Sequence, residues 1–145
     1  MIPKRIVVHC SATKNGVRVD ASEIDKWHKA RGWKGIGYHS VIQPSGEIQA
    51  GRPLNVQGAH CPEANADSIA ICLIGTDKFR VEQLEAMRSH IETLCRNFNI
   101  AKWELQVHNQ FKSAIEQGKT CPGFTVNDLL GFMWIDSKAL KGVEL

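Results

Sequence analysis

The sequence lacks any apolar run that approaches the roughly 20 residues needed to cross a bilayer, so we expect no membrane insertion. The first residues, MIPKRIVV, lack the long apolar segment and small-residue cleavage site of a signal peptide, so we expect the protein to be cytoplasmic as synthesised. Lysines and arginines are scattered, and the formal net charge is only +3. Such mild positive charge gives weak support for nucleic-acid binding, and we expect no nucleic-acid partner.

Paired cysteine motifs are also missing. The chain has no C-x-x-C and no short paired spacing, and its cysteines are odd in number: Cys10, Cys61, Cys72, Cys95 and Cys121. This pattern disfavours both a disulfide framework and a zinc ribbon, and we expect reduced thiols. No repeat, low-complexity tract or linker divides the chain. We therefore expect residues 1–145 to form a single domain, which is long enough to bury its own core.

Strands and helices are expected to alternate along the chain. In order, the patterns predict a strand at 4–9, a helix at 20–32, a hairpin at 38–51, a strand at 68–75, a helix at 81–100, a strand at 102–108 and a helix at 125–140. Asp20 with Glu23, and Thr125 with Asp128, have the spacing of helix capping boxes. Strands interleaved with helices predict an α/β fold with a mixed central β-sheet flanked by helices.

The adjacent residues His9 and Cys10 are both good metal ligands, but neighbouring side chains on a strand point to opposite faces. They cannot easily hold one metal ion together. His9 and His108 each stand at the end of a predicted strand, where sites in open α/β sheets tend to collect. Cys121, in the word GKTCPGF, is a candidate third ligand. The alternative is that both histidines bond to the backbone and that Cys121 is a small buried residue.

Four sequence motifs decide between these alternatives: VVHCSAT, WHKARGWKGIGYHSVIQPSGEIQAGRP, GAHCPEANADSIAICLIG and KTCPGF. In this order, over roughly residues 5 to 135, they resemble the zinc-dependent N-acetylmuramoyl-L-alanine amidases of the peptidoglycan-recognition type, which include small phage endolysins. The resemblance implies one zinc ion per chain. It places the zinc ligands on His9, His108 and Cys121, and the catalytic residues on Tyr38 and Lys119. Cys10, on the opposite face, is then expected in the core.

The same resemblance implies a function and a substrate site. The zinc would lie in a surface groove that holds the glycan strand and stem peptide of peptidoglycan, and the enzyme would cut the amide bond between N-acetylmuramic acid and L-alanine. His60 and Asn65 would contact the substrate, although a plain surface position fits His60 equally well. We expect a monomer that acts on the cell wall after release, as a phage or prophage endolysin. A cytoplasmic recycling amidase remains an alternative.

Two other functions are open. A non-catalytic peptidoglycan-binding module of this kind would lack the cysteine ligand, whereas Cys121 is present. A regulator that binds RNA polymerase would depend partly on residues ahead of the first zinc histidine, and only eight residues precede His9. One departure from the family pattern is the loop between His108 and Cys121, whose twelve residues are more than expected and whose path is open.

Several other residues suited to binding or catalysis are interpreted as structural. His39 follows Tyr38 on a predicted strand and points the other way, so we expect a buried, hydrogen-bonded histidine rather than a ligand. His28 is expected to be a half-exposed packing residue on its helix. Trp27, Trp33 and Trp134 could form a carbohydrate-stacking set, but aromatic residues at helical spacing are more often core residues, and we interpret them so.

Overall fold

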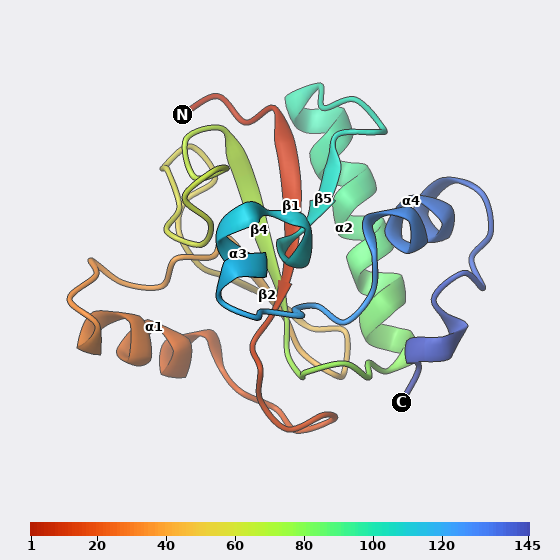
Figure 1. Ribbon diagram of the computed structural model, residues 1–145, viewed down its shortest axis with the longest axis horizontal. Coiled ribbons are helices and arrows are strands. Elements are labelled where there is room, and N and C mark those ends of the chain that lie inside the picture. Colours follow the sequence, from red (N-terminus) through yellow and green to blue (C-terminus); the bar gives the residue numbers. More distant parts are fainter.

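A five-stranded β-sheet forms the centre of the computed structural model, which describes residues 1–145 (Figure 1). The strands are β1 (Arg5–Cys10), β2 (Ser40–Ile42), β3 (Ile48–Ala50), β4 (Ser68–Leu73) and β5 (Leu105–Val107). Their spatial order is β3-β2-β4-β1-β5. Strand β1 pairs in parallel with β4 and β5, β2 pairs in parallel with β4, and only the β2–β3 hairpin is antiparallel. The predicted mixed sheet is confirmed.

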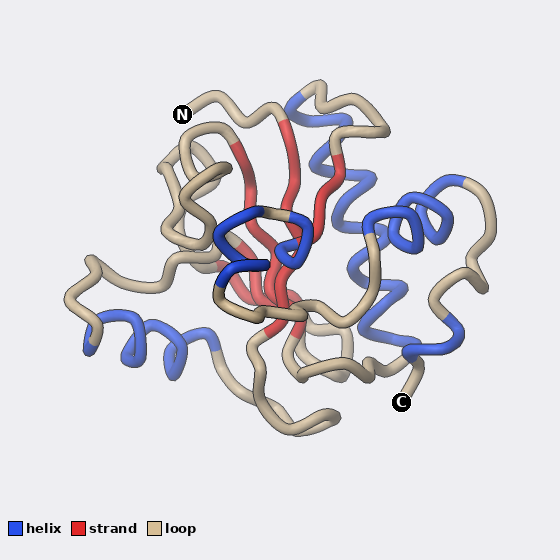
Figure 2. The backbone as a smooth tube through the Cα atoms, viewed as in Figure 1, coloured by secondary structure: helices blue, strands red, loops and turns tan.

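Helices cover both faces of this sheet, as Figure 2 shows. They are α1 (Ala21–Ala30), α2 (Val81–Phe98), α3 (Lys112–Glu116) and α4 (Val126–Trp134), with short 3-10 helices η1 (His108–Gln110) and η2 (Lys141–Val143). Helices α2 and α4 lie together against one face, and α3 lies across the other. None of these helices is both long and apolar enough to cross a membrane.

The alternation of β1 and β4 divides the core into two sides. Ile6 and Val8 of β1 belong to a large apolar cluster with α2 and α4, whereas Val7 packs on the other side with Phe111 of the segment before α3. Cys72 of β4 packs there too, against Ile24 of α1. All six residues of β4 are buried, as its continuous apolar run predicts. Each face of the central strands is therefore closed by different helices.

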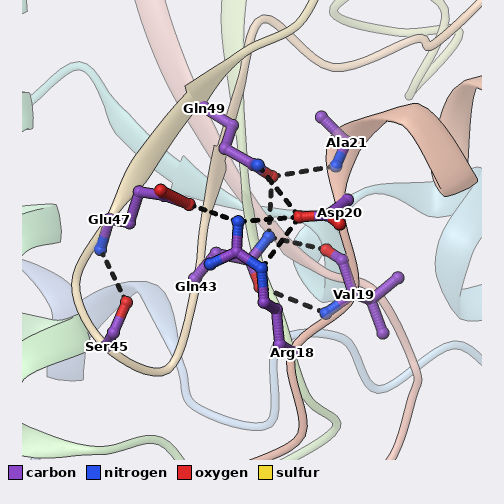
Figure 3. Close-up of polar contacts among 8 residues, drawn as sticks. All are labelled: Arg18, Val19, Asp20, Ala21, Gln43, Ser45, Glu47 and Gln49. Atoms are coloured by element: carbon purple, nitrogen blue, oxygen red, sulfur yellow. Dashed lines mark hydrogen bonds and ion pairs between the residues drawn. The ribbon is translucent and has the colours of Figure 1, made fainter.

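The segment that leads into α1 is attached to the β2–β3 hairpin by side chains (Figure 3). Gln43 donates from Nε2 to the Val19 carbonyl (2.6 Å) and accepts from the Val19 N–H (3.1 Å). Asp20 precedes α1 as predicted, but its carboxylate accepts from Arg18 (2.9 Å) and Gln49 (3.1 Å) and caps no helix N–H. The predicted capping box at this helix is therefore wrong: Arg18 and Gln49 bind the Asp20 carboxylate, and the Ala21 N–H at the start of the helix donates to Gln49 Oε1 (2.9 Å).

The other predicted elements differ mainly at their ends. Thr125 and Asp128 form the predicted reciprocal capping box at the start of α4. Helix α4 ends at Trp134, six residues before the predicted end at 140. Strand β5 is only three residues long, and His108 already begins η1. His108 therefore follows its strand directly, at the edge of the sheet where β1 also ends.

Candidate active site

Three side chains suited to metal binding meet at this edge of the sheet. His9 is the fifth residue of β1, His108 follows the neighbouring parallel strand β5, and Cys121 lies in the segment between α3 and α4. Their ligand atoms all lie within 4.8 Å of one another. Ligand atoms on a tetrahedral zinc ion are about 3.3–3.6 Å apart, as follows from Zn–N and Zn–S bond lengths. Small side-chain movements would therefore let all three bind one ion, leaving its fourth position open.

The protonation states of the two histidines suit metal binding. Burial lowers the pKa of His9 well below its ordinary value, and the neighbouring His60 and His108 lower it further. Burial, and then the ammonium of Lys119, lower the pKa of His108. Both imidazoles are therefore neutral at neutral pH, and a neutral imidazole keeps the lone pair that a metal ion needs.

Cys121 lies against the end of β1. The Cys10 N–H donates to its Sγ at 2.7 Å. Contact with the Cys10 thiol, and then burial, raise the pKa of the Cys121 thiol, so it carries its proton when no cation is near. Thiol ligands bind metals as thiolates, so metal binding here has to release that proton. The backbone N–H would then stabilise the thiolate.

Cys10 and His9 point to opposite faces of β1, as the strand alternation predicts. Cys10 is 5% exposed and packs in the same cluster as Ile6 and Val8, which confirms its position in the core. His9 is only 1% exposed and lies beneath the site, with the rings of Tyr38 (5.1 Å) and His108 (4.4 Å) close to its own. Of the three possible ligands, His9 is thus the most deeply placed.

A cavity of about 540 Å³ opens above these residues. Of the predicted site residues, only the deeply buried His9 does not line it. Those that do are Tyr38, His60, Asn65, His108, Lys119 and Cys121. The structure therefore brings the whole predicted set to one place. Asn65 also shapes the cavity wall, because its Oδ1 accepts from the backbone N–H groups of His60 and Cys61, both at 2.9 Å.

Tyr38 and Lys119 present polar groups to this cavity. The Tyr38 hydroxyl makes no hydrogen bond within the protein and is not fully buried, so it opens onto the cavity. Burial raises the pKa of Tyr38 well above its ordinary value, which keeps the hydroxyl protonated and able to donate. Lys119 is exposed and lines the same cavity, and its ammonium lowers the pKa of His108.

The twelve-residue segment between His108 and Cys121 forms part of the cavity wall. It folds into η1 and α3, and Ser113 at the start of α3 donates from N (2.8 Å) and Oγ (2.6 Å) to the carboxylate of Glu63. Ser113 and Gln117 line the cavity. Sequence reasoning missed both residues, since the short helix lacks a full period of apolar positions. The neighbouring 60–65 loop and α3 are therefore fastened to each other across the site.

Two structural interpretations of aromatic residues are wrong. Trp27 and Trp33 are 43% and 37% exposed and line the cavity instead of packing in the core. His28 is buried, not half-exposed, and its Nδ1 accepts from the Gly37 N–H at 2.8 Å. His39, by contrast, is confirmed as a buried residue with both ring nitrogens bonded to backbone groups.

The backbone next to Tyr38 lies unusually close to the loop that carries His60. A Cβ atom at Gly37 would stand 1.9 Å from the Ala59 carbonyl oxygen, which is far inside van der Waals contact. The Ala59 N–H donates to the Gly37 carbonyl at 3.1 Å. Only glycine permits this approach, so Gly37 sets the spacing between the Tyr38 and His60 walls of the cavity.

Two imidazoles and one thiol beneath an open cavity, instead of four ligands in a closed cluster, are the donor set of a catalytic rather than a structural metal site. Residues 1–124 match the family model described as N-acetylmuramoyl-L-alanine amidase, and the chain belongs to this family.

Individual relatives agree with this assignment. The endolysin of Escherichia phage T7 is 38% identical over 130 residues, which cover 82% of this chain and 80% of the relative. The amidase LysC from Clostridium intestinale URNW has a similar structure, with a TM-score of 0.77 and 29% identity over 90% of this chain and 83% of that one. A mutant of Drosophila PGRP-LB in complex with tracheal cytotoxin gives a TM-score of 0.76 and 25% identity, and the match covers 93% of this chain and 83% of that one.

Proposed function

We propose that the protein hydrolyses the amide bond between N-acetylmuramic acid and L-alanine in peptidoglycan, using one zinc ion held by His9, His108 and Cys121. The observation that supports this most strongly is the convergence of these three ligand atoms within 4.8 Å beneath an open cavity. Residues 1–145 act as one amidase domain and work as a monomer. As an endolysin, the protein would act on the cell wall after release.

The residues around the cavity suit the hydrolysis of an unactivated amide. A zinc ion bound there would supply Lewis acidity, polarising the scissile carbonyl and lowering the pKa of a water ligand. The amide carbonyl gains negative charge as it becomes tetrahedral. The Tyr38 hydroxyl and the Lys119 ammonium are the donors that would stabilise this oxyanion from the cavity walls. Tyr38 directly precedes β2 and Lys119 lies in the segment between α3 and α4, so the two donors come from different parts of the chain.

The cavity also offers surfaces for the rest of the substrate. We propose that Asn65 and His60 border the bound glycan and stem peptide, as part of the same wall. The exposed indoles of Trp27 and Trp33 extend this wall toward α1 and would stack on a sugar ring or an apolar peptide side chain. The structural neighbour that holds tracheal cytotoxin supports a ligand of the peptidoglycan type.

The alternative of a non-catalytic peptidoglycan-binding module has some support, because peptidoglycan-recognition proteins are among the relatives. The presence of Cys121 beside both histidines favours the hydrolase, since binding alone requires no thiol ligand. No feature of the structure specifically favours an RNA polymerase regulator.

Purified sacculi provide the test of this function. Dialysis against a strong chelator should abolish the loss of turbidity that the protein causes, and added zinc should restore it. Mass spectrometry of the products should show intact glycan strands and stem peptides with a free L-alanine amino terminus. Full activity in a zinc-free sample, or new reducing sugar ends, would contradict the proposal.

A further inference from the structure

A short chain of polar side chains leads from His9 through His60, which lines the cavity, to the buried Ser68, and the proposed reaction gives its hydrogen bonds no role. His9 Nε2 is 2.9 Å from His60 Nδ1, and His60 Nε2 is 3.1 Å from Ser68 Oγ. Ser68 Oγ lies 2.6 Å from the Ala64 carbonyl oxygen. Ser68 is fully buried at the start of β4, next to β1 in the sheet. The three side chains therefore form a continuous hydrogen-bonded path from the backbone to His9.

The backbone carbonyl at the end of this path fixes the direction of every hydrogen bond in it. A carbonyl oxygen only accepts, so the single hydroxyl proton of Ser68 points to Ala64. The Ser68 oxygen must then accept from His60, which places a proton on His60 Nε2. A neutral His60 has no second ring proton, so its Nδ1 accepts from His9 Nε2. His9 Nδ1 is left as the unprotonated nitrogen.

We propose that His60 is a positioning residue for His9, and that Ser68 sets the His9 tautomer through it, so that the Nδ1 lone pair of His9 is held ready for zinc. This inference rests on the proposed function, in which His9 is a zinc ligand. Metal-binding histidines generally donate their other N–H to a fixed acceptor, and such partners influence affinity without touching the metal. Here the acceptor is a second imidazole, whose own tautomer is set by a serine and a backbone carbonyl.

His39 provides an internal comparison. It is a buried histidine whose ring lies 6.4 Å from that of His60, and it has the same tautomer, because Nε2 bonds the Val56 carbonyl (2.7 Å) and Nδ1 accepts from the Ala70 N–H (3.0 Å). Its bonds go to the backbone and not to His9. Loss of His39 should therefore cost stability alone, whereas loss of the His60 acceptor should act on metal binding.

Two nearly isosteric substitutions separate positioning from packing. His60→Leu removes the acceptor for His9, while His60→Asn keeps an amide oxygen near the original Nδ1 position. Competition with a chromophoric chelator measures the zinc affinity of each full-length variant. We expect His60→Leu to weaken zinc binding about 10–100-fold, His60→Asn to recover most of that loss, and Ser68→Ala to weaken binding by less. His39→Leu should lower the melting temperature and leave zinc affinity unchanged.

Nitrogen-15 NMR of the metal-free wild-type protein tests the tautomer directly, even if a variant fails to fold. His9 should show a proton on Nε2 and none on Nδ1. A proton on His9 Nδ1, equal zinc affinity in the Leu and Asn variants, or an equal loss in His39→Leu would overturn the inference. If the wild-type protein bound no zinc at all, the proposed function itself would fail, and the NMR result would still decide the tautomer.

Discussion

Removal of one oxygen atom from Tyr38 separates a catalytic role for this residue from a packing role. Tyr38→Phe keeps the ring, and with it the contacts to His9 (5.1 Å between ring centroids) and His28 (5.4 Å). The hydroxyl makes no hydrogen bond within the protein, so its loss leaves no partner unsatisfied. We expect the free energy of unfolding to change by less than about 0.5 kcal/mol, and the zinc content to stay at one ion per chain.

The effect on catalysis should be much larger. Loss of one oxyanion donor raises the barrier by about 2.7–4 kcal/mol, which corresponds to a fall in kcat of roughly 100–1000-fold. KM should change little, because the donor acts on charge that develops only in the transition state. The assay is release of stem peptide from a soluble muropeptide, with zinc content and melting temperature measured on the same samples. An unchanged kcat, or a variant that purifies without zinc, would refute this role for Tyr38.

Three further predictions follow from neighbouring residues. Lys119→Ala should retain zinc but lose kcat to a similar degree in the same assay, and an apo variant would argue for a role in metal binding instead. Cys121→Ser should lose zinc and activity together, whereas Cys10→Ser should keep zinc and lose about 1–3 kcal/mol of stability; the reverse pattern of metal contents would mean that the strand alternation had been misread. Hydrogen bonds from the hydroxyl and then the backbone N–H of Ser113 lower the pKa of Glu63 to about 2, so this carboxylate stabilises the fold above its unfolded pKa of about 4.3 and loses that effect as the pH falls toward 2. Glu63→Gln should therefore show a weaker decline of melting temperature than wild type between pH 5 and 2, and parallel curves would contradict this.

The arrangement of the three candidate ligands could largely be predicted from the sequence. His9 and Cys10 separate because side chains on a strand alternate, and this rule holds whatever the strand packs against. His108 comes to the same edge because β1 and β5 run parallel. Short-range rules and the order of strands thus placed two histidines correctly. Cys121 was a candidate third ligand from its place after His108, whereas the positions of Tyr38 and Lys119 at the cavity came from the family resemblance and not from any periodicity.

Contacts between irregular segments could not be predicted in the same way. The pairing of His60 with His9 joins a loop to a strand, and no periodicity in the 51–67 segment indicates which way His60 points. The segment before Cys121 makes a contact of the same kind, in which Ser113 donates to Glu63, fifty residues earlier in the chain. Asp20 failed as a cap partly for the same reason: Gln49 is brought to it by tertiary structure, while its other partner, Arg18, is a local neighbour.

The close approach at Gly37 has a consequence for attempts to redesign this protein. The shape of a substrate cleft can be changed by enlarging or trimming side chains. The opening between Tyr38 and the 59–61 loop, however, is set by main-chain atoms of Gly37 and Ala59 in contact. Substitution at Gly37 would push both walls apart at once, and the displacement would reach His60 on one side and Tyr38 on the other. We therefore expect substitutions at Trp27, Trp33 or Gln117, which also line the cavity, to be better suited to changing substrate preference. A change in shape there leaves the positions of Tyr38 and His60 unchanged.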